Sequence, residues 1–242
     1  MATQLMSTIT SEYALGYATA EQQRLIRQAA RIAPVTERLF REAGIGPGQR
    51  VLDLGSGVGD VAMLVARLVG SRGEVVGIER EPSSIARAKS RAAEAGLQNV
   101  SFSQADVTQI ASDGPFDAAV GRFILMFLPD PVSVLRSISR LVRPGGVVAF
   151  QEPSWIPMLA LGSRLPLWSK VLAAIHETFL RSGVNMEMGL NLYAVFQQVG
   201  CPLQRCAWRP CWGAIAIARK CPSTFCAACA PLLSDTMFLW KD

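Results

Sequence analysis

Short apolar segments alternate with segments of helical periodicity over residues 50–152, and this alternation restricts the fold more than any other feature. The strands are expected at 50–54, 74–78, 100–104, 116–120 and 147–151, and they contain apolar runs such as VVGI, AAV and VVAF. The helical segments among them are 61–69, 83–95 and 131–141. Strands that alternate with helices of this length form βαβ units, whose parallel strands are covered on both faces. The alternation predicts the α/β class, as a Rossmann-like doubly wound sheet that is mostly parallel, with helices on both faces.

The remaining segments divide the chain into four parts. A helix is expected over 19–43, with Pro34 beginning a second helix inside that range. Beyond Pro153, an apolar segment interrupted by prolines is followed by helices expected at 169–181 and 191–199, which predicts a small helical cap. The expected parts are an N-terminal helical segment (1–34), a core (35–152), a cap with a closing helix (153–200) and an atypical Cys-rich tail (201–242).

The cysteines are confined to the last part of the chain. Their positions are Cys201, Cys206, Cys211, Cys221, Cys226 and Cys229. Only the last two have the CxxC spacing of a zinc site, and no second close pair completes a ligand set. Disulfides would require export. The prediction is no metal site and a tail of free thiols, with zinc, disulfides and an altered reading frame left as alternatives.

The charge and hydropathy of the sequence argue against a nucleic-acid partner and against a membrane span. The formal net charge is +5, but Lys and Arg are scattered among acidic residues and form no run. This pattern is not typical of a nucleic-acid surface, so no nucleic-acid partner is expected. No apolar stretch is long enough for a membrane span, and the first ten residues do not resemble a signal peptide. A cytoplasmic protein is expected, and its oligomeric state is left open.

The glycine-rich loop after the first expected strand indicates which cofactor the sheet binds. The loop contains Gly55, Ser56, Gly57 and Gly59. A dinucleotide site has the spacing G-x-G-x-x-G, with pyrophosphate at the helix N-terminus. Here the spacing is G-x-G-x-G, and Asp60 stands where the third glycine would be. A carboxylate there would compete with phosphate, whereas Asp53 suits an ammonium group. The loop therefore favours S-adenosylmethionine, which has an ammonium group and no phosphate.

Polar residues follow three further strands at the edge of the sheet where ligands bind. Glu79, with Arg80 beside it, ends the second strand, where an acid can accept both ribose hydroxyls. Asp106 follows the third strand and could accept the adenine amino group. Gly121 and Arg122 follow the fourth strand, where the methionyl end of the cofactor is expected.

Together these segments resemble the class I S-adenosylmethionine-dependent methyltransferases, particularly the small-molecule ubiquinone/menaquinone-biosynthesis type. The resemblance covers roughly residues 35–152 through the motifs VLDLGSGVGD, VVGIER, SQADV, FDAAVGRFILMFLPDP and LVRPGGVVAFQE. The segment YALGYATAEQQRLIRQA is similar to a lid in some of these enzymes. The family ends its sheet with an antiparallel hairpin, which 203–208 and 213–219 could supply.

The resemblance implies roles for individual residues. Asp53, Gly55 and Gly57 would border the methionyl part, and Glu79 would bind the ribose. Asp106 and Val107 would hold the adenine, Gly121 and Arg122 would line the methyl-donor end, and Tyr17 would close over the cofactor.

The expected activity is methyl transfer to a small, apolar or aromatic acceptor. Methyl transfer depends mainly on alignment of the reacting groups, so a base is needed only if the acceptor must lose a proton early. Candidates for a catalytic residue are Glu152, at the end of the fifth strand, and His176, the only histidine. Two alternatives remain: a non-catalytic relative that binds the same cofactor, and a nicotinamide-dependent oxidoreductase on the same fold.

Overall fold

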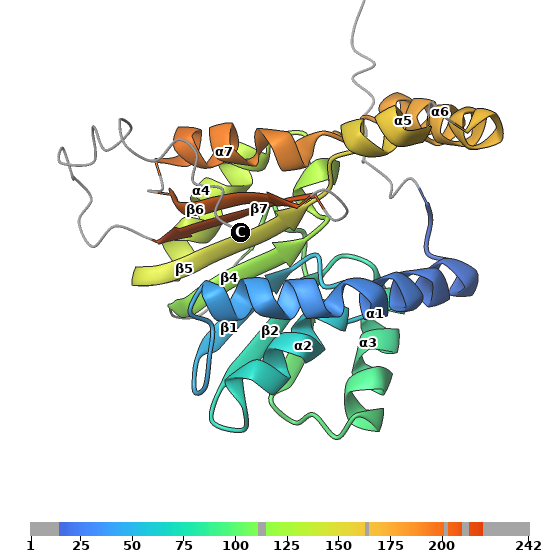
Figure 1. Cartoon of the computed structure of the whole chain (residues 1–242). Helices are drawn as coiled ribbons and strands as arrows, with labels where there is room; N and C mark the ends of the chain where they lie inside the picture. The colour runs from blue at the N-terminus through green and yellow to red at the C-terminus, as the bar shows by residue number, and fades with distance from the viewer. Residues whose placement is uncertain (1–14, 111–114, 163–164, 201–202, 210–212, 220–242) are drawn as a thin grey trace, which may run out of the picture.

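The structure is a computed structural model that describes residues 15–110, 115–162, 165–200, 203–209 and 213–219 of the 242-residue chain. Within these residues, seven strands form one sheet in the order β3-β2-β1-β4-β5-β7-β6 (Figure 1). The strands are β1 (Arg50–Leu54), β2 (Glu74–Glu79), β3 (Val100–Gln104), β4 (Phe116–Arg122), β5 (Val142–Glu152), β6 (Leu203–Arg209) and β7 (Gly213–Arg219). Strands β1 to β5 are parallel, and β7 runs antiparallel to both β5 and β6. The predicted α/β class and the closing hairpin are confirmed.

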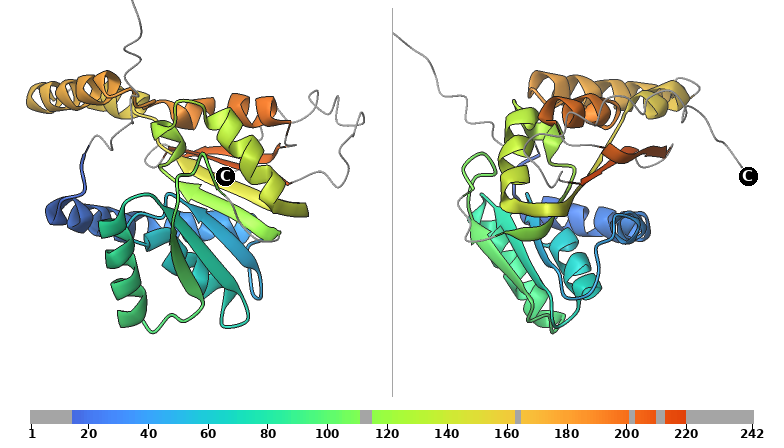
Figure 2. Two further views of the ribbon diagram at one scale, coloured as in Figure 1. Left: turned by 180° about the vertical axis from the view of Figure 1, so that it is seen from behind. Right: turned by 90° about the vertical axis from the view of Figure 1, so that its left-hand side faces the viewer.

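Helices cover both faces of the sheet (Figures 1 and 2). The helices α1, α2 and α3 lie on one face, and α4 and α7 lie on the other. The helical elements are α1 (Thr19–Glu42), α2 (Asp60–Val69), α3 (Pro82–Glu94), the 3₁₀ helix η1 (Leu125–Phe127), α4 (Pro131–Leu141), α5 (Ile156–Gly162), α6 (Pro166–Arg181) and α7 (Met188–Val199). In Figure 1, α5, α6 and the start of α1 lie on the side toward which the arrowheads of β4 and β5 point. These elements therefore flank the carboxyl ends of the strands, where α/β sheets bind ligands.

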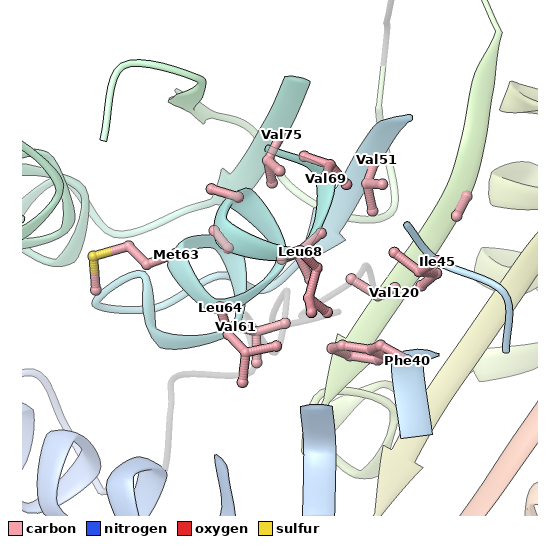
Figure 3. Close-up of a cluster of buried hydrophobic side chains, with 14 of the residues drawn as sticks. Phe40, Ile45, Val51, Val61, Met63, Leu64, Leu68, Val69, Val75 and Val120 are labelled. Carbon is pink, nitrogen blue, oxygen red and sulfur yellow. The ribbon is translucent and has the colours of Figure 1, made fainter. Parts of the chain in front are cut away.

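Alternate residues of each strand enter two separate cores, because successive side chains of a strand point to opposite faces. On one face, Val51 and Val120 pack with Phe40 of α1 and Leu68 of α2 (Figure 3). On the other face, Leu52, Ala119 and Phe150 pack with α4 and α7. Both faces of the central strands β1, β4 and β5 are thus buried, which explains apolar runs such as VVAF in β5. The edge strand β3 is different, because its sequence VSFSQ leaves alternate residues exposed.

The same alternation places polar side chains on defined faces where the strands end. Asp53 lies two residues after Val51, and Arg122 lies two residues after Val120. Both therefore belong to the face covered by α1 and α2, together with Gln151 of β5. Glu152 belongs to the opposite face. At this end of the sheet, Asp53 and Arg122 therefore lie on one face, and the buried carboxylate of Glu152 lies on the other.

Two local predictions are wrong. Pro34 does not begin a second helix, because α1 continues through it. Proline removes one helix hydrogen bond, but Ile32 and Thr36 on either side are buried, so packing holds the helix together. The expected boundary at residue 34 falls inside this helix. Strand β5 begins at Val142, five residues before its predicted start, since the glycine turn at 144–146 lies in an irregular stretch of its pairing with β4.

Other predictions fall on parts of the chain that the structure does not describe. Five of the six cysteines lie outside the described residues, and Cys206 is placed only by its backbone on β6. The alternatives for the tail therefore stay predictions. No described helix has both the length and the apolarity that crossing a membrane would require.

Candidate functional site

A cavity of about 530 Å³ lies at the carboxyl ends of the strands, a volume in the range of small-molecule sites. Nine of the residues singled out from the sequence line it. They are Tyr17, Gly55, Ser56, Gly57, Glu79, Arg80, Asp106, Val107 and Arg122. The parallel topology brings these residues together from the ends of four strands and from the segment before α1.

The glycine loop turns sharply between β1 and α2. Ser56 N donates to Ile78 O (2.9 Å), and Gly59 N donates to Ser56 O (2.8 Å). Gly57 has a φ of +53°, and a Cβ there would meet no other atom within 4 Å. The backbone at Gly57 is therefore bare where it borders the cavity, and a ligand can lie directly against it.

Glu79 fixes this loop to the end of β2. It is 9 % exposed. Its Oε2 accepts a hydrogen bond from Gly57 N (2.9 Å), and its Oε1 accepts from Arg80 N (2.9 Å) and Glu81 N (3.0 Å). These three amides orient the carboxylate. Since each oxygen has further acceptor capacity, the carboxylate can also receive hydroxyl donors from the cavity.

Asp53 is buried directly before the loop without a satisfactory partner. It is 1 % exposed, and neither carboxylate oxygen accepts a well-formed hydrogen bond. Burial raises the pKa of Asp53 to about 8, against the lowering effects of the Arg122 charge and of the nearby Ala62 amide. The carboxylate does not line the cavity, but cavity residues lie close enough to influence its pKa. An added positive charge at the loop would favour its ionised form.

Arg122 brings a positive charge to the same side of the cavity. Burial lowers the pKa of this guanidinium, while the charges of Asp60 and Asp53 raise it. Its Nη1 donates to Thr36 Oγ1 (3.2 Å), and the Thr36 hydroxyl lies 2.7 Å from Gln151 Oε1. Gln151 Nε2 is buried without a hydrogen-bond partner. Helix α1 thus takes part in holding a cavity-lining cation.

Replacing Thr36 with valine should lower the free energy of unfolding by about 1–3 kcal/mol, because Gln151 Oε1 then loses a buried partner. Thr178→Val is the matched control. Its exposed hydroxyl donates only within its own helix, to Ala174 O, so a change below about 0.5 kcal/mol is expected. Urea unfolding of both variants measures the difference, and equal effects would show that the buried network contributes little.

Two further contacts border the cavity. Arg80 Nε donates to the Tyr17 hydroxyl (3.1 Å), which connects the segment before α1 with the end of β2. Asp106 accepts from the Thr108 hydroxyl (2.6 Å) and from its amide (2.8 Å), and these bonds hold the pKa of Asp106 below its usual value. Tyr17 and Asp106 therefore occupy defined positions at the cavity.

Arg24, Gln28, Asp60, Ser84 and Thr108 add further polar groups to the cavity wall. The largest apolar group in the wall consists of Phe123, Ile124, Met126, Phe127, Leu128, Pro129, Pro153, Trp155, Ile175 and Phe179. These residues come from the segment after β4, the segment after β5 and helix α6. None of these residues was predicted from the sequence to line the cavity, although the run FILMFLPDP directly after a strand end was a visible signal.

Two expected lining residues serve packing instead. Gly121 lets Phe150 and Ile124 approach the backbone of β4. Gly59 has a φ of +87°, and a Cβ there would come within 3.1 Å of Ala88 and within 3.0 Å of Phe102. Neither glycine borders the cavity.

The two candidate catalytic residues do not reach the cavity. Glu152 is 0 % exposed, and its carboxylate accepts three backbone amides from residues 124–126. Burial raises the pKa of Glu152 to about 7, while these amides lower it. His176 lies on α6, but Ile175 and Phe179 are the residues of that helix that line the cavity. Neither Glu152 nor His176 is among the residues that line the cavity, and a contact of either with a substrate stays a prediction.

No cluster of three or more His, Cys, Asp or Glu side chains suited to a metal ion occurs in the described part of the chain.

Comparisons with known proteins agree with this arrangement. A family model described as a methyltransferase domain matches residues 45–199. An arsenite methyltransferase from Aquipseudomonas alcaligenes is 38% identical over 113 residues, which cover 43% of this chain and 33% of that protein. A 2-phytyl-1,4-naphtoquinone methyltransferase from Synechococcus elongatus is 38% identical over 108 residues, covering 44% and 46%. A ubiquinone/menaquinone biosynthesis C-methyltransferase from Bdellovibrio bacteriovorus is 33% identical over 135 residues, covering 55% and 57%. The matched regions thus span between a third and just over half of the length of these relatives.

Solved structures share the fold. A SAM-dependent methyltransferase from Aquifex aeolicus superposes with a TM-score of 0.60 at 18% identity, covering 82% of this chain and 97% of that one. The magnesium protoporphyrin IX methyltransferase of Synechocystis gives a TM-score of 0.56 at 15% identity, covering 84% and 85%. The family model covers well over half of the chain and includes the glycine loop and the ends of β1 to β5. The chain belongs to the methyltransferase domain family.

Proposed function

We propose that this protein is an S-adenosylmethionine-dependent methyltransferase that acts on a small, apolar or aromatic molecule. The observation that carries the proposal is the division of one cavity into two parts. A polar part contains the glycine loop, Glu79 and Arg122. An apolar part is formed by the lining residues after β4 (123, 124 and 126–129), by Pro153 and Trp155, and by Ile175 and Phe179 of α6. The first part fits a charged cofactor, and the second fits a neutral acceptor.

The residues present fit S-adenosylmethionine. The bare backbone at Gly57 leaves room for a ligand, and the Glu79 carboxylate can accept ribose hydroxyls. The unpaired Asp53 carboxylate gains from a nearby ammonium group, and the Arg122 guanidinium suits a carboxylate. Asp106, Val107 and Tyr17 would surround the adenosyl part, as the resemblance implies.

The bound cofactor supplies an electrophilic methyl group on a positively charged sulfur. The chain contributes alignment and exclusion of water. Apolar side chains such as Phe123, Phe127 and Trp155 would hold an aromatic ring by stacking and would keep the reacting groups dry. The 2-phytyl-1,4-naphtoquinone methyltransferase among the relatives is named for an aromatic acceptor of this kind.

Two further parts of the proposal concern partners and the covering of the cavity. The scattered charge supports an absence of nucleic-acid partners. Residues 15–34 would act as part of a lid, since Tyr17 and Leu25 line the cavity. Residues 153–200 would form the acceptor cap.

A thermal-shift measurement tests the choice of cofactor. S-adenosylhomocysteine at one hundred times its Kd stabilises a protein by about 2.7 kcal/mol, so the Tm should rise by about 5 °C or more in a chain of this size. NADH should leave the Tm unchanged, because its pyrophosphate would face Asp60 and Glu79. A shift with NADH alone would support the oxidoreductase alternative. Cofactor binding without methylation of any member of a panel of naphthols and quinols would support a non-catalytic relative.

A further inference from the structure

Glu152 carries a fully buried carboxylate that the proposed cofactor site does not use. Its Oε1 accepts from Ile124 N (2.9 Å) and Leu125 N (2.8 Å), and its Oε2 lies 3.3 Å from Met126 N. Three successive amides at the start of η1 therefore converge on one side chain. A buried carboxylate is costly unless it is hydrogen-bonded, so the side chain and the segment are mutually dependent.

The segment that Glu152 holds begins with an unusual backbone conformation. Phe123 has a φ of +57°, which is rare for a bulky residue and costs about 1–3 kcal/mol. Phe123 N donates to Gln151 O (2.9 Å), and Met126 O accepts from Asn185 N (2.8 Å). Such a conformation persists only when the surroundings determine it. The end of β5 supplies most of these contacts, through Gln151 and Glu152.

The held segment is a large part of the apolar cavity wall. Phe123, Ile124, Met126 and Phe127 all line the cavity. Their orientation follows from the backbone turn that Glu152 caps, because side-chain direction is set by backbone conformation. A change at Glu152 would therefore move several lining side chains together.

A second carboxylate holds the other apolar segment in a similar way. Glu187 accepts from Ser154 Oγ (2.6 Å) and Trp155 N (3.1 Å), and Gly189 N donates to Pro153 O (2.8 Å). Pro153 and Trp155 line the cavity. Both apolar segments are thus fixed by acidic side chains that lie behind the wall.

We propose that Glu152 is a positioning residue for the methyl acceptor, which fixes residues 123–127 as a rigid wall and touches neither acceptor nor cofactor. The proposal rests on the proposed function, because it assigns the apolar part of the cavity to the acceptor. It predicts that changes at Glu152 affect acceptor binding far more than cofactor binding.

Glu152→Gln and Asp117→Asn form a matched pair for the test. The first keeps the size of the side chain, but its amide NH₂ cannot accept, so at least one of the three backbone hydrogen bonds is lost. Asp117 accepts from Arg50 N (2.7 Å) and Arg143 Nε (2.6 Å) at the opposite ends of the strands. Both substitutions remove contacts of a structural carboxylate, but only one of these carboxylates holds the cavity wall.

Two measurements are made on each full-length variant. Hydrogen exchange at the amides of 124–126 should become about tenfold faster in Glu152→Gln and stay unchanged in Asp117→Asn. Affinity for 2-naphthol, titrated by calorimetry with saturating S-adenosylhomocysteine, should fall by about tenfold in Glu152→Gln only. Affinity for S-adenosylhomocysteine should stay within about twofold in both variants. If Glu152→Gln does not fold, Glu152→Asp is measured instead, since it keeps the charge and withdraws it by one methylene.

Each of the following outcomes would overturn the inference. Unchanged exchange at 124–126 would show that Glu152 does not hold the wall. Unchanged 2-naphthol affinity in Glu152→Gln would show that acceptor binding does not depend on Glu152. An equal loss of 2-naphthol affinity in both variants would show a general effect of lowered stability. If the unmodified protein binds S-adenosylhomocysteine but not 2-naphthol, the acceptor class in the proposed function is wrong, and the inference fails with it. If it binds neither compound, the cofactor assignment itself is wrong.

Discussion

Replacing Glu79 with alanine should weaken S-adenosylmethionine binding by about one hundredfold or more, which corresponds to about 2.7 kcal/mol. Two losses combine in this variant. The carboxylate would no longer accept the ribose hydroxyls, and hydrogen bonds to a charged group are worth about 1.5–3 kcal/mol each. In addition, Gly57 N loses the acceptor that holds the glycine loop to β2. Calorimetric titration of the variant measures the effect.

Glu74→Ala is the matched control for this prediction. Glu74 is the first residue of the same strand, is exposed and pairs with Arg50 on the surface. Its removal should change cofactor affinity by less than about twofold, because exposed ion pairs contribute little. Equal affinities in the two variants would remove Glu79 from the cofactor site.

Replacing Asp53 with asparagine should stabilise the cofactor-free protein at pH 8.5 by roughly 5 kcal/mol, because each unit of pKa shift corresponds to about 1.4 kcal/mol. Burial raises the pKa of Asp53 to about 8, so the folded state binds this proton more tightly than the unfolded state does. The resulting stability is present below pH 4 and is lost as the pH rises toward 8. Asparagine avoids this loss because it does not ionise.

The pH dependence separates this effect from ordinary changes in packing. At pH 5 the native Asp53 is protonated in the folded protein but mostly ionised in the unfolded protein, so the difference between variant and unmodified protein should fall to about 1.6 kcal/mol and should disappear below pH 4. Urea unfolding at both pH values measures it. The variant should also bind S-adenosylmethionine at least about tenfold more weakly, because the ammonium group loses its charge partner. A variant that is less stable at pH 8.5 would show that the native carboxylate has a partner that stabilises it.

Sequence patterns were sufficient to predict the parallel core, because each of its strands is marked by a short segment between turns and helical segments. Strands β1 and β3 and helix α4 have the predicted bounds, and the polar residues at the strand ends converge because parallel strands end at one edge. The continuity of α1 through Pro34 was not predictable from local preference, since burial of Ile32 and Thr36 overrides the proline. Helix α5 was missed because its segment, 156–162, is short and contains Pro157.

Features of the site that depend on tertiary packing were likewise not predictable from the sequence. Strand alternation explains why Glu152 faces away from Asp53 and Arg122, yet the sequence alone places all three at the same edge. The direction of a side chain at a strand end depends on which helix covers that face. Thr36, which is distant in the sequence, was missed for this reason: only the packing of α1 on the sheet brings it to Arg122 and Gln151.

A crystal structure of the protein soaked with S-adenosylhomocysteine tests the central claim most directly. The account predicts the adenosyl amino acid in the cavity, with both ribose hydroxyls within hydrogen-bonding distance of Glu79 and the amino-acid head against the backbone of 55–57. Its sulfur should face the apolar wall of 123–127. An empty cavity at saturating ligand, or a pyrophosphate-containing molecule retained at the glycine loop, would contradict the account.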